Sequence, residues 1–259
     1  MSPTPSSTHL VLIPSYNSGA LVLRTAREAL AQWAPVWVVV DGSTDGTGAQ
    51  LQALAATEPN LRVLLLPLNR GKGAAVLHGL HEARRLGYTH ALTMDADGQH
   101  PASHIGEFMA ASQRAPEAMV LGVPQFDASA PALRRRGRRI SNWWANLETL
   151  GAGVQDSLFG FRVYPIAPLI DVMHARHFMR RFDFDPEAAV RLVWAGVPPL
   201  NLAAPVRYLT PAEGGVSHFN YLRDNVLLTG MHVRLMAEFV LRLPQLLLRR
   251  RQPLNVKPE

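Results

Sequence analysis

The sequence predicts an α/β fold built on an open, mostly parallel sheet with helices on both faces. Short apolar runs alternate with amphipathic segments through the first half of the 259-residue chain, a pattern typical of βαβ units. The apolar runs contain few polar residues, as expected for parallel strands that are buried on both faces. Hydrophobic residues make up 47% of the chain and charged residues 18%, which indicates a folded protein with a large core.

Nine elements are expected in order before residue 125. The apolar runs predict strands at 10–13, 36–40, 61–66, 91–94 and 119–122. Between them, apolar residues at helical spacing predict helices at 20–33, 47–57, 73–86 and 103–114.

The pattern changes after residue 125. A basic, Trp-containing helix is expected at 131–150, followed by an apolar segment at 158–164. Pro186 suits the first turn of a further helix. Prolines interrupt the extended segment 197–209, which therefore suits an edge strand. One long helix, about 219–248, should close the fold.

These elements predict one domain with a tail at each end. Residues 1–8 are expected to form a flexible tail, 9–212 the α/β domain and 213–259 a C-terminal helical segment whose helix kinks at Pro244. Charges recur every few residues in that helix, so no apolar stretch is long enough to span a bilayer. It fits either an amphipathic helix on a membrane surface, with Arg249–Arg251 on lipid headgroups, or a helix packed on the domain or on a second subunit of a homodimer.

Charge and composition narrow the function classes. The chain has no cysteine, which excludes a disulfide framework, a thiolate nucleophile and a Cys-based zinc site. Its net charge of +6 favours an anionic partner: a nucleotide, a phospholipid surface or nucleic acid. No nucleic-acid-binding motif is present, so nucleic acid is the least favoured of the three. The polar N-terminus does not resemble a signal peptide, and a cytoplasmic protein, peripherally bound at the membrane, is expected.

Asp95 and Asp97 are the most informative residues of the chain. They follow the strand expected at 91–94 and therefore lie at the carboxyl edge of the sheet, where open α/β sheets bind ligands. Two carboxylates with room for water suit Mg²⁺ or Mn²⁺ bridged to the phosphates of a substrate. The alternative is a pair of solvated acids in a turn made by Gly98.

Three more polar loops follow predicted strands. After the first strand, Tyr16 can stack on a nucleobase and Asn17 can reach its edge, while Asp41 after the second strand can accept from a base or ribose. Asp45 suits capping of the next helix. After the third strand, Lys72 lies between two glycines and can approach a phosphate closely, although the spacing is not that of a Walker A loop.

Taken in order, these loops resemble the family 2 glycosyltransferases of the GT-A fold, and within them the dolichyl- or polyprenyl-phosphate sugar transferases. The matching motifs are Pro14-Ser-Tyr-Asn17, Asp41-Gly-Ser-Thr-Asp-Gly46, Asn69-Arg-Gly-Lys-Gly73 and Asp95-Ala-Asp-Gly-Gln-His-Pro101. A looser match continues through Asp156-Ser-Leu-Phe-Gly-Phe-Arg162, Phe182-Asp-Phe-Asp-Pro-Glu187 and Pro205-Val-Arg-Tyr208. The resemblance covers roughly residues 8 to 210. Two positions depart from the family pattern, Val40 in place of an acid and Ser18 in place of a frequent Glu, and both fall in the expected nucleoside pocket.

The resemblance implies transfer of a hexose from a UDP- or GDP-sugar with inversion at the anomeric carbon. Mg²⁺ or Mn²⁺ would be held by Asp97 with Asp95 nearby and would act as a Lewis acid on the departing diphosphate. The residues implied to bind the nucleotide-sugar are Pro14, Tyr16, Asn17, Asp41, Lys72, Asp95, Gln99 and His100.

The acceptor decides whether the reaction needs a general base. A lipid phosphate, most simply a polyprenyl phosphate, is already anionic and can attack directly, with Arg162 as its clamp or as an ion-pair partner of Asp156. A hydroxyl of a glycolipid or cell-envelope glycan would need a base from Asp156, Asp183, Asp185 or Glu187, and Asp156 is favoured. Asp185 is expected to cap the helix at Pro186 instead.

Some residues allow two interpretations. His218 can close over a phosphate or begin the long helix, and of Trp143 and Trp144 one at least should pack in the core. His78 and His81 lack a third ligand at zinc-site spacing. A non-catalytic nucleotide-sugar-binding or scaffold protein is the alternative from another function class, and the presence of Asp95, Asp97 and Lys72 argues against it.

Overall fold

The computed structural model describes residues 3–126, 132–206 and 221–250. One seven-stranded sheet runs through the molecule in the order β3-β2-β1-β4-β6-β5-β7. Its strands are β1 (His9–Ser15), β2 (Val36–Asp41), β3 (Leu61–Leu66), β4 (His90–Thr93), β5 (Met119–Gln125), β6 (Arg162–Pro165) and β7 (Pro199–Pro205). All five strands expected in the first half are present at the expected places.

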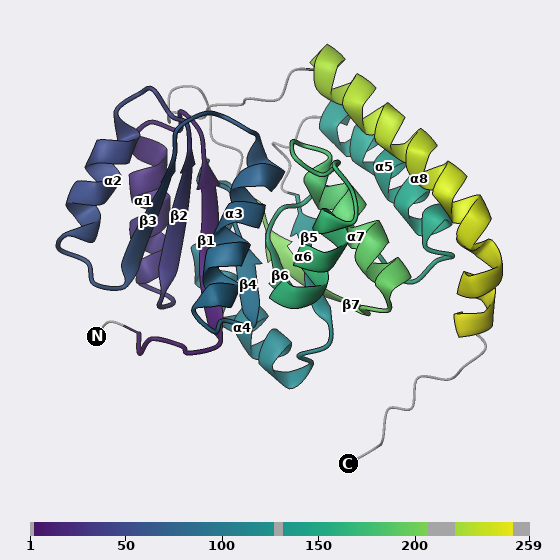
Figure 1. Cartoon of the computed structure of the whole chain (residues 1–259), viewed down its shortest axis with the longest axis horizontal. Coiled ribbons are helices and arrows are strands. Elements are labelled where there is room, and N and C mark those ends of the chain that lie inside the picture. The colour runs from purple at the N-terminus through teal and green to yellow at the C-terminus, as the bar shows by residue number, and fades with distance from the viewer. Residues whose placement is uncertain (1–2, 127–131, 207–220, 251–259) are drawn as a thin grey trace.

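Helices cover both faces of this sheet (Figure 1). They are α1 (Ala20–Leu30), α2 (Thr47–Ala55), α3 (Lys72–Arg85), the short 3₁₀ helix η1 (Ala102–His104), α4 (Ile105–Arg114), α5 (Ala132–Glu148), α6 (Ile166–His174), α7 (Phe184–Ala195) and α8 (Tyr221–Arg250). Leu10 and Leu12 of β1 face a core shared with α3, α6 and α7. Val11 and Ile13 face a second core shared with α1, α2 and α4. Burial on both faces explains the uninterrupted apolar strands.

The sheet is mostly parallel, as predicted, with one reversed strand. β6 pairs antiparallel with β4 on one side and with β5 on the other, whereas β7 pairs in parallel with β5 and forms the edge expected from its prolines. The reversal of β6 returns the chain to the sheet edge at which β4 ends. It therefore brings the segment just before β6 next to Asp95.

The long helix α8 packs along the outside of α5 (Figure 1). Met231, Leu235 and Phe239 of α8 are buried in the core that α7 also enters. On another side of α8, Val226, Val233 and Val240 are each more than 60% exposed. Because these residues recur every seven positions, they form one apolar stripe along the helix. Among the described helices, none has both the length and the apolarity needed to cross a membrane.

Candidate active site

The loops that follow the strands enclose one large cavity of about 1240 Å³. At one end it is lined by the predicted strand-end residues Pro14, Tyr16, Asp41, Lys72, Asp95, Asp97, Gln99 and His100. At the other end its walls come from α5 and α8 and include Arg138, Ser141, Trp144, Leu228 and His232. The cavity thus joins the polar edge of the sheet to a largely helical wall, an arrangement suited to two substrates that must meet.

Asp41 holds the loop that carries Lys72. Its carboxylate accepts hydrogen bonds from the backbone N–H groups of Arg70 at 2.9 Å and Gly71 at 2.7 Å. The two loops touch so closely that a Cβ on Gly42 would lie 2.3 Å from the backbone nitrogen of Asn69. Asp41 also lines the cavity. The structure therefore adds a positioning role to the nucleoside contact predicted for Asp41.

The loop after β1 is tied to the loop after β2. The side-chain oxygen of Asn17 accepts from the backbone N–H of Thr44 at 2.8 Å. Asp45 accepts from the backbone N–H of Thr47 at 3.1 Å, at the start of α2, and from that of Gly19 at 3.0 Å. Asp45 thus binds the first residue of α2, near the predicted place, although the N-cap position itself is Gly46. Among the described residues that line the cavity, Tyr16 is present and Asn17 is not, so Asn17 lies where it fixes loops rather than where it reaches a base.

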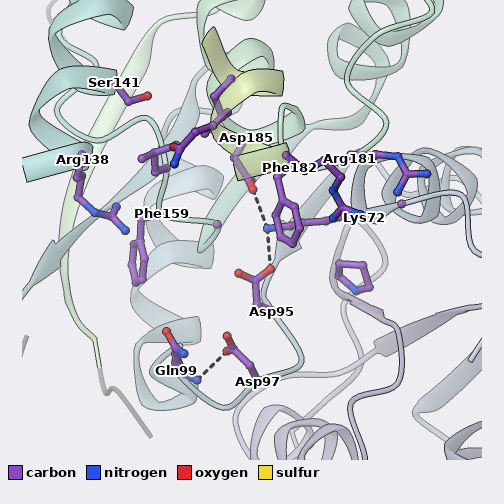
Figure 2. Close-up of a pocket in the computed structure, with 18 of the residues that line it drawn as sticks. Lys72, Asp95, Asp97, Gln99, Arg138, Ser141, Phe159, Arg181, Phe182 and Asp185 are labelled. Carbon is purple, nitrogen blue, oxygen red and sulfur yellow. Dashed lines mark hydrogen bonds and ion pairs between the residues drawn. The ribbon is translucent and has the colours of Figure 1, made fainter. Parts of the chain in front are cut away.

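Lys72 lies between two carboxylates (Figure 2). Its ammonium nitrogen is 2.6 Å from Asp95 and 2.7 Å from Asp185. Burial disfavours the charged lysine, but the carboxylates of Asp185 and Asp95 outweigh it and raise its pKa. The helix-capping prediction for Asp185 was wrong: the residue lies inside the first turn of α7, and its side chain makes no capping bond but pairs with Lys72. The sequence could not show this contact, since 113 positions separate the two residues.

Gly160 completes this charged cluster. A Cβ at this position would lie 2.6 Å from the Lys72 ammonium and 3.1 Å from an Asp95 oxygen. Because residue 160 is a glycine without a side chain, Lys72 can reach Asp95.

Asp97 has the electrostatic environment of a cation ligand. It accepts the backbone N–H of Gln99 at 3.0 Å, while burial and the neighbouring charge of Asp95 raise its pKa to about 6. For Asp95, burial is outweighed by Lys72 and His100, which lower its pKa. Within the described residues, no group of three His, Cys, Asp or Glu side chains could hold a metal by itself. Two carboxylates beside a cavity fit a Mg²⁺ or Mn²⁺ ion that takes its other ligands from water and substrate phosphates. Since Asp95 already binds Lys72, Asp97 is the better ligand of the two.

His100 is a buried neutral donor beside these acids. Its Nδ1 accepts the backbone N–H of Asp95 at 2.9 Å, so the ring proton lies on Nε2. Nε2 is 3.6 Å from an Asp95 oxygen. Burial lowers the pKa of His100 to about 4, and the ring packs edge-on against Phe159 and Phe161. His100 therefore orients the Asp95 loop from inside the cavity wall.

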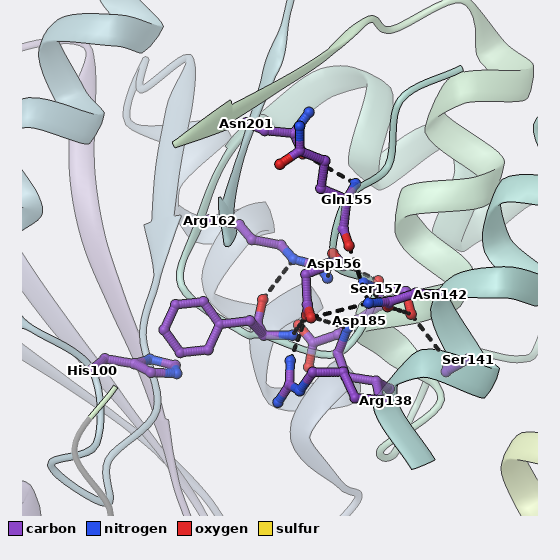
Figure 3. Close-up of polar contacts among 12 residues, drawn as sticks. His100, Arg138, Ser141, Asn142, Gln155, Asp156, Ser157, Arg162, Asp185 and Asn201 are labelled. Atoms are coloured by element: carbon purple, nitrogen blue, oxygen red, sulfur yellow. Dashed lines mark hydrogen bonds and ion pairs between the residues drawn. The ribbon is translucent and has the colours of Figure 1, made fainter. Parts of the chain in front are cut away.

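Arg162 is not among the described residues that line the cavity, and Figure 3 shows it among the polar contacts around Asp156. Its guanidinium is fully buried and donates to the backbone carbonyls of Asp185 at 2.6 Å, Phe159 at 2.8 Å and Asp156 at 3.1 Å. A fourth bond joins it to the Tyr164 hydroxyl at 3.0 Å. This arrangement matches neither of the two roles expected for Arg162, which were a phosphate clamp and an ion pair with the Asp156 carboxylate. The guanidinium instead holds together the segment before β6 and the start of α7.

The Asp156 carboxylate is also fixed by hydrogen bonds within the protein, chiefly through Oδ1. It accepts from Arg138 and from the backbone N–H groups of Leu158 at 3.0 Å and Phe159 at 2.7 Å. The four acids expected as a possible base are Asp156, Asp183, Asp185 and Glu187. Of these, only Asp185 is among the described residues that line the cavity. Its Oδ1 is buried and has no hydrogen-bond partner within the described part of the chain. The arrangement thus favours Asp185 over Asp156 as a base.

The helical end of the cavity contains residues that sequence reasoning missed. Arg138 lies in the basic helix expected at 131–150, and no sequence motif contains Ser141 or His232. Their signal is weak because 91 positions separate Ser141 from His232, which approach within 3.4 Å. Trp144 is half-buried beside His232, whereas Trp143 is 60% exposed. His218, Arg251, Arg207 and Tyr208, and the side chains of Arg249 and Arg250, lie outside the described residues.

The chain is similar in sequence to several known proteins. The chain is 33% identical over 180 residues to the polyprenol monophosphomannose synthase of Mycolicibacterium smegmatis, a match that covers 62% of each chain. It is 30% identical over 161 residues to the undecaprenyl-phosphate mannosyltransferase of Micrococcus luteus, covering 60% of this chain and 65% of that one. The matched region is thus a little under two thirds of the length of these curated relatives.

A solved structure shows the same fold at lower identity. Glucosyl-3-phosphoglycerate synthase from Mycobacterium tuberculosis, crystallised with Mn²⁺, UDP-glucose and phosphoglyceric acid, superposes with a TM-score of 0.59 at 16% identity, over 90% of this chain and 80% of that one. The GT-A fold predicted from the sequence is confirmed. The family model for glycosyl transferase family 2 matches residues 10–178, and the chain therefore belongs to that family.

Proposed function

We propose that the protein transfers a hexose from a nucleotide-diphosphate sugar to a lipid-linked acceptor, most simply a polyprenyl phosphate, with inversion at the anomeric carbon. The observation that carries the proposal is the large cavity, which has the strand-end motifs at one end and an arginine-containing, partly apolar helical wall at the other. The polar end suits a soluble nucleotide-sugar, and the partly apolar end with its arginines suits a lipid phosphate. The names of the two mannosyl-transferring relatives support the choice of acceptor.

At the sheet end, the donor would lie across the strand-end loops. Tyr16, which is 37% exposed at the cavity, would stack on the base, and Pro14 and Asp41 would hold the base and ribose. Gln99 and His100 would line the path of the diphosphate. Lys72 would organise Asp95 and Asp185 around the reacting carbon, because it contacts both carboxylates.

Asp97, with Asp95 nearby, would hold Mg²⁺ or Mn²⁺. When bound, the ion would neutralise the charge that builds on the departing diphosphate. The protein forms no covalent intermediate in this proposal, so its contribution is to position both substrates and to exclude water.

At the helical end, the acceptor would meet positive charge and apolar surface together. Arg136, Arg138 and Arg223 line this end of the cavity, as do Ile140 and Leu228. A phosphate oxygen is already a nucleophile near neutral pH, so the arginines need only hold it, as guanidinium groups do well.

The same helices would rest on a membrane surface. Trp143 and Ile140 of α5 are 60% and 61% exposed, and the stripe Val226, Val233 and Val240 on α8 is equally open. Apolar side chains beside arginines are typical of interfacial helices. We assign 9–212 to the transferase domain and 213–259 to this associating segment, with residues 1–8 as a tail, and a second copy of the chain is the alternative occupant of the apolar face.

A hydroxyl acceptor is the second candidate, and Asp185 favours it. Its buried Oδ1 has no hydrogen-bond partner in the described part of the chain, so it could accept the proton of an attacking hydroxyl. Asp185→Asn tests this candidate. Transfer to either acceptor should fall because Asp185 also pairs with Lys72, but loss of a base should lower transfer to a hydroxyl by about a further hundredfold or more.

A screen of donors and acceptors tests the proposal. The protein, with Mn²⁺ or Mg²⁺, is offered UDP- and GDP-sugars with and without undecaprenyl phosphate, and released nucleoside diphosphate is measured. Release that needs both metal and lipid phosphate is the expected result. Donor binding without lipid-dependent release would favour a hydroxyl acceptor, and failure to bind any donor would favour a scaffold protein.

A further inference from the structure

A serine, a histidine and a glutamate are aligned at the helical end of the cavity. Ser141 Oγ of α5 lies 3.4 Å from Nε2 of His232 on α8, and Nδ1 of His232 lies 2.9 Å from Oε1 of Glu148 on α5. All three residues are buried, Glu148 completely. Ser141 and His232 line the cavity.

The direction of each hydrogen bond follows from the neighbours of Ser141. The side-chain oxygen of Asn142 accepts both the backbone N–H and the hydroxyl of Ser157, at 2.8 and 2.9 Å. The hydroxyl proton of Ser157 is therefore used, and its oxygen, 3.0 Å from Ser141 Oγ, accepts from Ser141. Ser141 has then no proton left for His232, so Nε2 of His232 must carry the proton that it shares with Ser141.

This direction excludes a Ser-His-Glu nucleophile. In such a triad the imidazole accepts the serine proton, whereas here the serine donates away from the ring and the ring donates to the serine. Glu148 can form a hydrogen bond with Nδ1 of His232 whether its carboxyl group is protonated or ionised. His232 is consequently a fixed N–H donor, aimed by a carboxylate that has one hydrogen-bond partner for its Oε1 and none for Oε2 within the described residues.

A fixed donor in this position suits an anion. The bond from His232 to Ser141 is long, at 3.4 Å, so an anionic oxygen would be a stronger acceptor for the Nε2 hydrogen than the serine is. The side chains of Arg136, Arg138 and Arg223 line the same cavity.

The wall around this donor is partly apolar. Leu228 and Val233 line the cavity next to His232, and Trp144 stacks on its ring with 6.0 Å between centroids. Apolar surface beside an anion donor and arginines fits a phosphate monoester with a hydrocarbon chain better than free phosphate.

We propose that His232, aimed by Glu148, donates its Nε2 hydrogen to the phosphate of a lipid acceptor. This inference rests on the proposed function. It assigns acceptor binding to α8, a helix that contains none of the motifs found at the strand ends. It makes His232 an acceptor-binding residue whose loss should affect the acceptor and leave the donor nucleotide unaffected.

Geranyl phosphate, a short soluble prenyl phosphate, tests the inference by calorimetry on the full chain. Removing His232 alone would leave the buried Glu148 carboxyl group without its partner, so the variant is His232→Phe combined with Glu148→Met, which removes both partners. We expect about tenfold to hundredfold weaker binding of geranyl phosphate, the range for a lost hydrogen bond to a charged group. Binding of UDP or GDP should not change. His78→Gln, at an exposed histidine on α3, is the matched control and should bind both like the wild type.

A second measurement needs no substitution. In the wild type, geranyl phosphate should shift the Nε2 resonance of His232 in ¹⁵N spectra, and geraniol should not. Equal binding of geranyl phosphate by the wild type and the double variant would overturn the inference while leaving the proposed function intact. A wild type that binds UDP or GDP but no geranyl phosphate would overturn both. Inorganic phosphate that binds as tightly as geranyl phosphate would overturn the lipid assignment.

Discussion

Replacing Arg162 by lysine should unfold the protein more easily rather than weaken acceptor binding alone. The guanidinium is fully buried and serves four acceptors: the carbonyls of Asp156, Phe159 and Asp185 and the hydroxyl of Tyr164. Lysine keeps the positive charge but has a shorter, single-headed donor group with three N–H bonds. It therefore cannot reach all four acceptors from the same backbone position.

The size of the effect follows from the acceptors left without a donor. If lysine keeps two of the four bonds, two buried acceptors lose theirs, at about 1–3 kcal/mol each. The free energy of unfolding should fall by about 2–6 kcal/mol, a large part of the total stability of an ordinary domain. The Asp185 carbonyl is among the acceptors, so the carboxylate that pairs with Lys72 should also shift, and turnover should fall with every acceptor.

Urea unfolding followed by far-ultraviolet circular dichroism measures the stability, and steady-state kinetics measures turnover. Arg24→Lys is the matched control, since Arg24 forms an exposed pair with Glu28 at 3.6 Å and exposed pairs contribute at most about 1 kcal/mol. Unchanged stability of Arg162→Lys, with a higher KM for the acceptor alone, would refute the reasoning. That result would mean that the guanidinium reaches the acceptor, as a phosphate clamp would.

Three further predictions concern the metal, pH and the membrane. Asp97→Asn should weaken Mn²⁺-dependent binding of UDP or GDP by more than about a hundredfold, which is the upper range for changes to residues outside the metal ligands. It should not lower stability at pH 7.5, because the raised pKa of Asp97 means that its negative charge opposes folding. Equal calorimetric titrations of variant and wild type would contradict this. Burial and then His90 lower the pKa of His9 to about 4, so the stability that neutral His9 supports is complete above its unfolded pKa near 6.5 and is lost as the pH falls towards 4. At pH 5 the free energy of unfolding should be lower by about 2 kcal/mol for this reason. In urea unfolding, His9→Gln should therefore lose about 2 kcal/mol less than the wild type between pH 7.5 and 5, and an equal loss in both would contradict the prediction. Val240→Asp should reduce sedimentation with anionic vesicles, whereas Ala53→Asp on the exposed side of α2 should not; an equal response of the two would argue against membrane contact through α8.

Those parts of the site that follow strands could be predicted from the sequence. Each motif lies within a few residues of an apolar run, and parallel strands end at the same sheet edge, so the strand pattern is enough to place Pro14, Asp41 and Asp97 together. The confirmed family, fold and first five strands rest on the same local pattern. Asp45 could likewise be assigned to the start of α2 because its partner Thr47 is two positions away.

Contacts between distant segments could not be predicted in this way. Asp185 looked like a helix cap because Pro186 follows it, and only the packing of α7 against α3 places it 2.7 Å from Lys72. Arg162 looked like a phosphate ligand because it is charged, and only the antiparallel return of β6 shows that its four acceptors lie inside the protein.

Strand periodicity and motif spacing are local properties of the chain, and they were enough to predict the fold, the family and the sheet end of the cavity. Which polar groups meet depends instead on tertiary packing: Lys72 pairs with Asp185 across 113 positions, Arg162 donates to the Asp185 carbonyl across 23, and Ser141 lies beside His232 across 91. The physical reason is that a polar side chain finds its partner only after the chain has closed around it. A buried group must be paired, but nothing in its own neighbourhood along the sequence names the partner.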